Sequence, residues 1–234
     1  MNQPITIITG AGSGVGRSLA IALAAQGHHI ALAGRTRSKL EETASQCSAS
    51  PGLMIHPTDL RDEPSAATLV DDVIARWGRI DNLVNCAGVA PLSPIDRTTD
   101  NILRDTFSVN AIGPAHLIIR CWPHFKTQKS GRIVNVSTMG TTDPFAGFFA
   151  YAASKSALDS MTRSAAKEGL GIGVKVFGVN LGAVETPMLR SNFSEKVLPH
   201  ARTLTPEFVA NVISDCLNGT RDADNGRCIP VPSP

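Results

Sequence analysis

Short apolar runs rich in β-branched residues alternate with longer amphipathic stretches along this 234-residue chain. Such runs are typical of parallel strands buried on both faces, and the stretches between them suit crossover helices. The alternation predicts an α/β fold, a Rossmann-type doubly wound parallel sheet of about seven strands with helices on both faces. The predicted strands lie near residues 5–8, 29–33, 53–57, 81–84, 132–136, 174–179 and 227–231. Because no repeat, low-complexity tract or linker interrupts the pattern, residues 1–234 are expected to form a single domain.

The helices are predicted from the segments between these strands. They run from the first glycine-rich segment to near residue 27, over 38–46, 63–77, most of 99–125 and 151–169, and from residue 205 onward. Within the fourth of these, Asn110 is a polar residue between two apolar ones, which by itself indicates a helix-surface or kink position. Thr205 is the predicted N-cap of the last helix, with Pro206 at its first position.

The first strand leads directly into a glycine-rich segment at residues 9–16 and then into a helix. In this context backbone N–H groups and the helix N-terminus can hold the pyrophosphate of a dinucleotide. Gly10, Gly14 and Gly16 follow the pattern T-G-x-x-x-G-x-G rather than G-x-G-x-x-G, because Val15 occupies the third position of the latter. A glycine-rich loop can also be a simple tight turn, but the strand-to-helix context favours dinucleotide binding.

The end of the second strand indicates which dinucleotide binds. An NAD site usually offers an acidic residue roughly 20 residues after the glycine loop, where it binds the ribose 2′-hydroxyl. No carboxylate stands at the end of this strand, where Gly34 is followed by Arg35. A guanidinium can bind a 2′-phosphate with two hydrogen bonds. Arg35 could instead be a solvated loop residue, but its position favours NADP over NAD.

Polar and small residues follow several of the predicted strands. Asp59 comes after the third strand and Ser137 after the fifth, while the fourth is followed by Asn85, Ala87 and Gly88. Small residues let a flat ring or a ribose approach the backbone, and ligands of open α/β sheets bind beyond the carboxyl ends of the strands. The convergence of these residues on one edge predicts the ligand site.

The only tyrosine of the chain, Tyr151, is followed by Lys155 at helical spacing. Residues four apart on a helix share a face, so the phenol and the ammonium can project into one site. The adjacent cation is expected to lower the pKa of the phenol toward the working range of an acid or base. With the hydroxyl of Ser137 nearby, the group can move a proton on and off a carbonyl or alcohol oxygen while another agent moves a hydride.

Composition excludes several other classes of protein. The net charge of +2 and the lack of basic runs argue against nucleic acid or an anionic membrane as partner. No apolar run approaches the ~18 residues of a spanning helix, and the first strand begins too early to leave room for a signal peptide. Five scattered cysteines without a CxxC pair indicate reduced thiols and a cytoplasmic protein. The six histidines lack metal-ligand spacing, so no metal site is expected.

On these residues the chain resembles the short-chain dehydrogenase/reductase family over nearly its whole length. The resemblance implies that Tyr151 passes the proton to or from the substrate oxygen, to which Ser137 donates a hydrogen bond. Lys155 would bind the nicotinamide ribose and lower the pKa of Tyr151, and Asn110 would hold a water that links Lys155 to solvent. Cofactor contacts are implied for Gly10, Ser13, Gly14, Val15, Gly16, Asp59, Leu60, Asn85, Ala87, Gly88, Tyr151, Lys155, Val184 and Thr186.

The chain departs from the family pattern at three places. Cys86 stands where the family has a second asparagine, and Leu181 replaces a proline before Gly182. Proline would fix φ and remove an N–H group, so the loop after the sixth strand is expected to be looser. The segment 188–204, where the family carries its substrate lid, is short and suggests an open pocket.

The function predicted from the sequence is an NADP-preferring oxidoreductase that interconverts a carbonyl and a secondary alcohol. Reduction of a 3-oxoacyl thioester is the favoured reaction, with sugar, polyol and xenobiotic carbonyls as alternatives. Phe145, Phe148 and Phe149 indicate an apolar pocket wall or a subunit contact, and the family resemblance implies a homodimer or homotetramer built from the two long helices. The competing class is a non-catalytic NADP-binding sensor or scaffold, which could lose Ser137, Tyr151 or Lys155; all three are present.

Overall fold

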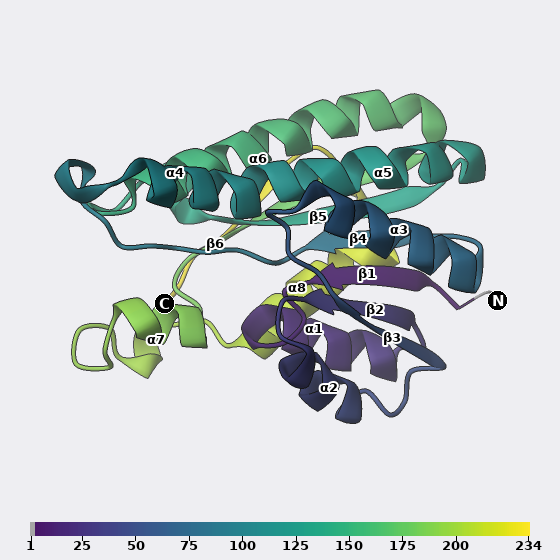
Figure 1. Cartoon of the computed structure of the whole chain (residues 1–234), viewed down its shortest axis with the longest axis horizontal. Helices are drawn as coiled ribbons and strands as arrows, with labels where there is room; N and C mark the ends of the chain where they lie inside the picture. Colours follow the sequence, from purple (N-terminus) through teal and green to yellow (C-terminus); the bar gives the residue numbers. More distant parts are fainter. Residues whose placement is uncertain (1–2) are drawn as a thin grey trace.

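A computed structural model describes residues 3–234 and places seven parallel strands in one sheet of order β3-β2-β1-β4-β5-β6-β7 (Figure 1). The strands are β1 (Ile5–Thr9), β2 (His29–Gly34), β3 (Gly52–Pro57), β4 (Asn82–Asn85), β5 (Gly131–Thr138), β6 (Val174–Leu181) and β7 (Cys228–Val231). The predicted doubly wound parallel sheet is confirmed, and each strand lies within a few residues of its predicted place.

Helices cover both faces of the sheet (Figure 1). One layer consists of α1 (Gly14–Ala25), α2 (Arg37–Ser45) and α8 (Pro206–Asn218), and the opposite layer of α3 (Glu63–Trp77), α4 (Asp100–Phe107), α5 (Gly113–Gln128) and α6 (Phe149–Gly169). The short helix α7 (Pro187–Asn192) projects from the same end of the sheet as the start of α4.

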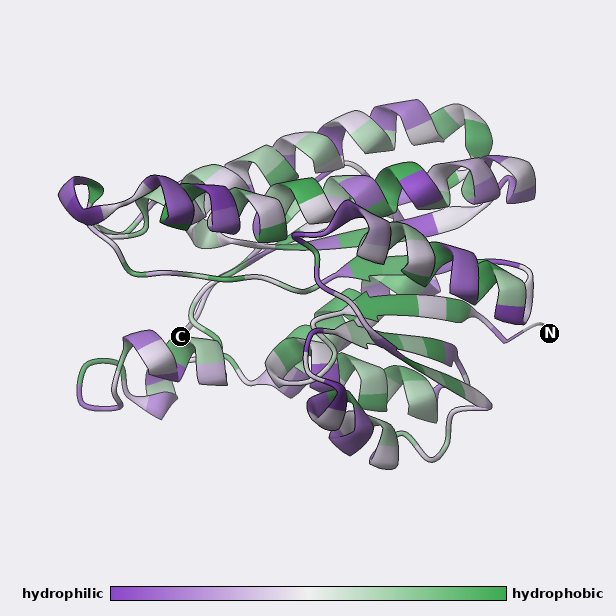
Figure 2. Ribbon diagram, in the orientation of Figure 1, coloured by the Kyte–Doolittle hydropathy of each residue, from purple (hydrophilic) through white to green (hydrophobic). Residues whose placement is uncertain are grey.

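Most positions of the central strands are apolar because helices cover both faces of the sheet, and the hydropathy colouring shows these strands mainly in green (Figure 2). Side chains alternate between the two faces along a strand. In β1, Ile7 packs into the core under α3 and α5, whereas Ile8 packs into the core under α1 and α8. Pro230 in β7 is tolerated because β7 is an edge strand that pairs only with β6.

The helix ends follow local sequence signals. Thr205 caps α8, and its side-chain oxygen accepts a hydrogen bond from the backbone N–H of Phe208 at 3.2 Å, as the sequence predicts. Gly78 ends α3 in the left-handed region at φ 75°, where glycine is favoured.

The long stretch predicted over 99–125 is divided by a π-helical turn at Ser108–Ile112, between α4 and α5. Such turns insert an extra residue into a helix and occur often at functional sites. Asn110 lies in the middle of this turn, so its indicated kink position agrees with the structure.

The order of the strands reverses between β1 and β4: the chain proceeds outward from β1 to β3, returns to place β4 beside β1, and then proceeds outward the other way to β7. Open α/β sheets bind ligands in the crevice at such a switch point, beyond the carboxyl ends of the strands. Over residues 3–234, none of the helices has the length and apolar character needed to cross a membrane.

Candidate active site

The glycine-rich loop after β1 lies against the loop after β4 and the segment after β6 because two of its glycines have no side chain. Gly10 has a φ of 68°, and a Cβ there would lie 2.8 Å from the Cα of Ala87. Gly14 has a φ of 51°, and a Cβ there would lie 2.9 Å from the Cγ2 of Thr186. Both positions combine a left-handed backbone with a close approach that only glycine permits. The loop therefore brings Ala87 and Thr186, both predicted cofactor contacts, to the same place.

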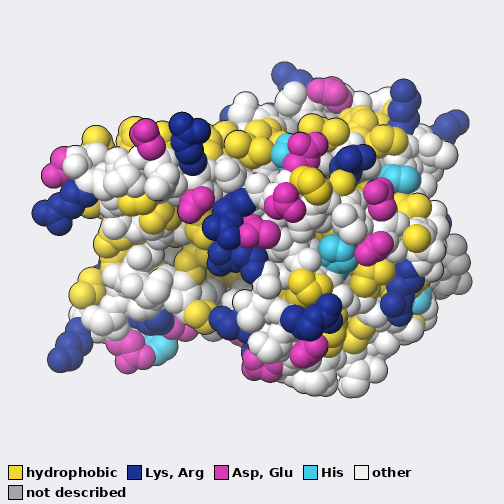
Figure 3. All heavy atoms as spheres, viewed as in Figure 1, with side chains coloured by type: hydrophobic (Ala, Val, Ile, Leu, Met, Phe, Trp, Pro, Cys, Tyr) yellow, Lys and Arg dark blue, Asp and Glu magenta, His cyan; other side chains and the backbone are white. Residues whose placement is uncertain are grey.

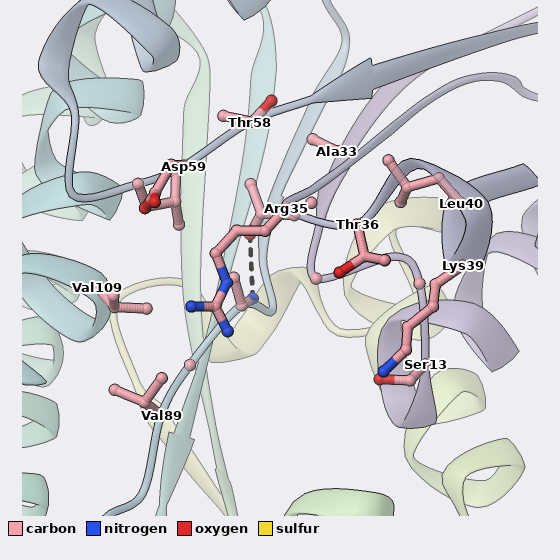
Figure 4. Close-up of a pocket in the computed structure, with 17 residues that line it drawn as sticks. Ser13, Ala33, Arg35, Thr36, Lys39, Leu40, Thr58, Asp59, Val89 and Val109 are labelled. Atoms are coloured by element: carbon pink, nitrogen blue, oxygen red, sulfur yellow. Dashed lines mark hydrogen bonds between the residues drawn. The ribbon is translucent and has the colours of Figure 1, made fainter.

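A cavity of about 190 Å³ opens beside this loop at the carboxyl ends of the central strands (Figure 4). It is lined by Thr9, Gly10, Gly12, Ser13, Ala33, Gly34, Arg35, Thr36, Lys39, Leu40, Thr58, Asp59, Leu60, Ala87, Gly88, Val89 and Val109. Seven of the predicted cofactor contacts are among these lining residues: Gly10, Ser13, Arg35, Asp59, Leu60, Ala87 and Gly88. Val15 and Gly16 lie behind the loop as buried residues in the first turn of α1.

The cavity has a positive end. The guanidinium of Arg35 reaches across it, and the ammonium of Lys39, in the first turns of α2, lies beside the hydroxyl of Ser13 (Figure 4). Asp59 is the one lining residue with a carboxylate, and this group pairs with Arg61 at 2.6 Å. That hydrogen bond, with a smaller contribution from Arg35, lowers the pKa of Asp59. Lys39 was not among the predicted contacts, although the sequence Arg-Ser-Lys at the start of the second helix carries the signal.

The loop after β4 is fixed by Thr9, whose Oγ1 accepts hydrogen bonds from the backbone N–H groups of Cys86 at 3.0 Å and Ala87 at 3.1 Å. The side chain of Asn85 is buried, and its Nδ2 donates to Asn135 Oδ1 at 2.8 Å. Ala87 and Gly88 line the cavity and Asn85 does not, and its cofactor contact stays a prediction.

Asn110 ties three segments together. Its amide accepts a hydrogen bond from the N–H of Val89 at 2.9 Å and donates to the carbonyl of Val89 at 2.8 Å and to Ser154 Oγ at 3.0 Å. The π-helical turn is thereby joined to the loop after β4 and to α6. Since Val89 lines the cavity, Asn110 connects the cavity lining to α6, which carries the predicted catalytic residues.

Lys155 is buried beside the end of the cavity. Its Nζ donates to the carbonyl of Val136 at 2.7 Å, and a Cβ on Gly88 would lie 3.5 Å from that Nζ. Burial lowers the pKa of Lys155 to about 8, while the nearby Cys86 and Asp159 act in the opposite direction. The ammonium is therefore close to losing its proton near neutral pH.

The electrostatics of Tyr151 differ from the expectation that Lys155 would lower its pKa. Burial raises the pKa of Tyr151 to about 12, a hydrogen bond with the Thr138 side chain lowers it, and Asp159 raises it further. The ammonium of Lys155 is held by the Val136 carbonyl, and desolvation of the phenol dominates. The phenol of Tyr151 is thus protonated at neutral pH in this structure.

Ser137 lies at the carboxyl end of β5 and carries a hydroxyl group that is buried yet has no hydrogen-bond partner among residues 3–234. Buried polar groups are nearly always paired, and an exception calls for an explanation such as a catalytic role. The neighbouring Thr138 contacts Tyr151 through its side chain, which sequence reasoning missed. An unpaired hydroxyl beside a protonated phenol suits two hydrogen bonds to one substrate oxygen.

The segment after β6 is held more firmly than expected. Leu181 continues β6 as a buried residue paired with Val231, and the N–H of Gly182 donates to the carbonyl of Val231 at 2.9 Å. The strand therefore extends through the position where proline was expected, and the predicted looseness is wrong at Leu181. Beyond it, Val184 is buried and Thr186 caps α7 by accepting from the N–H of Leu189 at 3.2 Å.

Two lines of evidence identify the class of protein. A glycine loop at the switch point, a positive cavity and a Ser–Tyr–Lys group define a dinucleotide-dependent oxidoreductase site. Residues 4–197 match the short chain dehydrogenase family, so the chain belongs to that family and is an oxidoreductase that binds a nicotinamide cofactor.

Individual proteins that are similar to this chain support the same family assignment. A fatty acyl-CoA reductase from Acinetobacter baylyi is 32% identical over 89% of this chain and 71% of its own length. An uncharacterised oxidoreductase from Mycobacterium bovis is also 32% identical, over 91% of this chain but only 63% of its own length. The crystal structure of a 3-ketoacyl-(acyl-carrier-protein) reductase from Brucella melitensis, complexed with NADH, has the same fold. Its TM-score is 0.91 at 24% identity, and the match covers 98% of this chain and 96% of that one.

Proposed function

We propose that this protein is an NADPH-dependent reductase that converts the carbonyl of a 3-oxoacyl thioester into a secondary alcohol. The observation that carries the proposal is that Tyr151 and Lys155 both contact the end of β5 on either side of Ser137: Lys155 Nζ donates to the carbonyl of Val136 at 2.7 Å, and Tyr151 is hydrogen-bonded to the Thr138 side chain. The cofactor would be held by the glycine loop, Gly88, Lys155 and Thr186, where backbone atoms can approach closely because a Cβ at Gly10 or Gly14 would collide. When bound, its nicotinamide would supply the hydride.

The protein groups supply the proton. With its pKa raised to about 12 by burial, Tyr151 is protonated at neutral pH and can donate to the developing alkoxide oxygen. The unpaired hydroxyl of Ser137 can donate a second hydrogen bond to the same oxygen. The protonated phenol can supply the proton that reduction of a carbonyl needs, and its phenolate would be the base in the reverse reaction.

The preference for NADP rests on two cations. Arg35 and Lys39 both line the cavity, and its single carboxylate, Asp59, is paired with Arg61. A 2′-phosphate there would gain charge-assisted hydrogen bonds, whereas the ribose hydroxyls of NAD would find no free carboxylate among the lining residues. This supports NADP over NAD.

The substrate proposal rests on the apolar surroundings of Tyr151. The ring of Phe148 lies 5.6 Å from that of Tyr151 and 6.1 Å from that of Phe193, just beyond α7. Asn192 in α7 donates to the carbonyl of Ala90 at 2.8 Å, so the short lid contacts the loop after β4 rather than leaving the pocket simply open.

Other large apolar side chains in the segments around Phe148 and the lid are exposed. They belong to the loops after β4 and β5, to the start of α6 and to the lid: Leu92, Ile95, Phe145, Phe149, Met188 and Val197. Figure 3 shows hydrophobic side chains along the hollow between the two lobes that carry α4 and α7. Such a surface suits an acyl chain and not a polyhydroxylated sugar. The relative from Acinetobacter baylyi is named for an acyl thioester substrate, which supports the same class.

The deciding experiment follows the loss of reduced cofactor absorbance with acetoacetyl thioester and a long-chain 3-oxoacyl thioester, with NADPH and NADH in parallel. Turnover that is faster with NADPH and improves with chain length would support every part of the proposal. Turnover only with small polar ketones would replace the substrate class. Binding of NADPH without turnover of any carbonyl would assign the protein to the competing class of non-catalytic sensors.

The assembly and location complete the proposal. Exposed Leu103, Ile112 and Ile119 on α4, the π-helical turn and α5 support a homodimer or homotetramer built on the long helices. Light scattering on the purified protein tests this. All five cysteines are free thiols, which supports a reducing compartment such as the cytoplasm.

A further inference from the structure

A buried carboxylate lies on α6 that the reaction described above does not use. Asp159 is 4% exposed, and its Oδ2 accepts a hydrogen bond from Asn180 Nδ2 at 2.8 Å. Its Oδ1 has no hydrogen-bond partner among residues 3–234, and no lysine or arginine of that range forms a salt bridge with it. An unpaired buried carboxylate is unfavourable for stability, so its presence needs a reason.

Its place on the helix points to that reason. Tyr151, Lys155 and Asp159 follow one another at intervals of four residues and so share one face of α6. With a rise of 1.5 Å per residue, the backbone of Asp159 lies roughly 6 Å along the axis from that of Lys155 and roughly 12 Å from that of Tyr151. In keeping with this, Asp159 acts to raise the pKa of both side chains.

Asn180 anchors the carboxylate to the strands that carry the active site. It is 5% exposed, and its residue position in β6 is paired with Ser137 in β5. Its Nδ2 donates both to Asp159 and to Thr141 Oγ1, at 3.0 Å, in the turn that follows Thr138. The orientation of Asp159 is therefore fixed by the same backbone that positions Ser137 and Thr138.

Few other charged groups compete for the carboxylate. On α6 the ionisable neighbours are Tyr151, Lys155 and, one turn further, Arg163. From β7, Cys228 Sγ donates to the backbone carbonyl of Asp159 at 4.0 Å and accepts from Arg163 at 3.7 Å. The side chains that face it from β5, β6 and the following turn are uncharged, and the guanidinium of Arg163 is exposed. Lys155 is thus the buried cation closest to it in the helix.

We propose that Asp159 is a positioning residue for the Tyr151–Lys155 pair. Anchored by Asn180, its carboxylate is a fixed negative charge that favours the protonated forms of both side chains. The carboxylate stabilises the ammonium of Lys155 and the neutral phenol of Tyr151, which is the state from which a carbonyl oxygen can be protonated. It touches neither substrate nor cofactor, and its effect is transmitted through the field inside the protein.

The test uses the single tyrosine of the chain. Because Tyr151 is the only one, the ultraviolet absorbance of tyrosinate reports on this residue alone, with no substrate and no turnover required. Rapid pH jumps followed before the protein unfolds give the titration of the folded protein, and tryptophan fluorescence reports unfolding. Since the pKa of Lys155 is lowered to about 8, Lys155 is neutral throughout the tyrosine titration in every variant and does not confuse the comparison.

In Asp159→Asn the acceptor for Asn180 is kept and the charge is lost. The midpoint for Tyr151 should fall by about one pH unit, the shift expected for removing a unit charge roughly 12 Å away at an effective dielectric constant of ~20. Asp159→Ser, which is also neutral, should give the same direction and serves if the first variant folds poorly. Asp143→Asn is the matched control: it removes a carboxylate eight residues before Tyr151, but an exposed one, and should leave the midpoint unchanged.

A midpoint in both neutral Asp159 variants that coincides with that of the wild type would overturn the proposal and leave Asp159 with a purely structural role. An equal fall in Asp143→Asn would also overturn it, since any nearby carboxylate would then suffice. Because the readout needs no hydride transfer, this result is independent of whether the proposed reductase activity is found.

Discussion

The carboxyl edge of the sheet has two halves, one on either side of Gly88, that differ in the groups that form the site and in how deeply those groups are buried. Around β1, β2 and β4 the site consists of backbone and of exposed charges such as Arg35 and Lys39. Around β5, β6 and α6 it consists of buried side chains, with Ser137, Lys155 and Asp159 each less than 5% exposed. The first half can bind an anion through local geometry and charge, whereas in the second half burial sets the protonation states.

The largest expected effect lies in the buried half. Tyr151→Phe removes the proton donor while keeping the ring that packs against Phe148. Turnover should fall by about 10²- to 10⁴-fold, the usual contribution of a general acid, and NADPH affinity should stay nearly unchanged because the cavity is untouched. Steady-state kinetics and calorimetric cofactor binding measure the two quantities. Ser156→Ala, on the exposed face of the same helix, is the control. Undiminished turnover in Tyr151→Phe would remove Tyr151 from the mechanism.

The next effect separates catalysis from stability. Ser137→Ala should reduce kcat by about 10²- to 10³-fold, the loss typical of one donor to a developing oxyanion. The melting temperature should not fall, because the hydroxyl has no partner to lose among the described residues. Thr138→Val, by contrast, should lower the melting temperature, because the Oγ1 of Thr138 accepts a hydrogen bond from the N–H of Gly140 at 3.1 Å. A stability loss in Ser137→Ala matching that of Thr138→Val would mean that the hydroxyl has a structural partner.

The exposed half gives a smaller effect that depends on the cofactor. Arg35→Asp should weaken NADPH binding by roughly 10- to 100-fold, as expected for lost hydrogen bonds between charged groups, and should change NADH binding far less. Titration of each cofactor against the variant measures the ratio. Arg37→Asp, which carries the same charge change on an exposed residue outside the cavity lining, controls for long-range charge. Equal losses for NADPH and NADH would show that Arg35 does not contact the 2′-phosphate.

The same contrast explains how far sequence reasoning reaches. The strands and the glycine loop are encoded locally, as short apolar runs and a strand-to-helix turn, so they are predicted within a few residues; helix α3 coincides with its predicted span at 63–77. Tyr151 and Lys155 are found by their helical spacing, which is also local. The π-helical turn around Asn110 and the helix α7 carry weaker local signals and were not predicted as such.

What the sequence could not show is burial, which depends on the whole fold. For this reason the sequence predicts a lowered pKa for Tyr151, whereas the structure gives a raised one: desolvation of the buried phenol outweighs the expected effect of Lys155. Asp159 continues the spacing of Tyr151 and Lys155, yet on an isolated helix an aspartate would be taken for a solvated residue. Only its contact with Asn180 on β6 shows that it is buried.

The smallest effect concerns Phe148, which lies between the buried site and the exposed apolar side chains at the site's opening (the apolar mouth). Phe148→Ala removes two ring contacts, to Tyr151 and Phe193, each worth about 0.5–1.5 kcal/mol beyond area burial. KM for a long-chain 3-oxoacyl thioester should rise by up to roughly tenfold, while acetoacetyl thioester, which does not reach the mouth, should change less. Phe208→Ala is the matched control, because that ring is 52% exposed and belongs to α8, outside the apolar surface described above. If KM rose equally for both chain lengths, Phe148 would act by orienting Tyr151; a rise that grows with chain length would make Phe148 part of the wall along which the acyl chain leaves the buried half of the site.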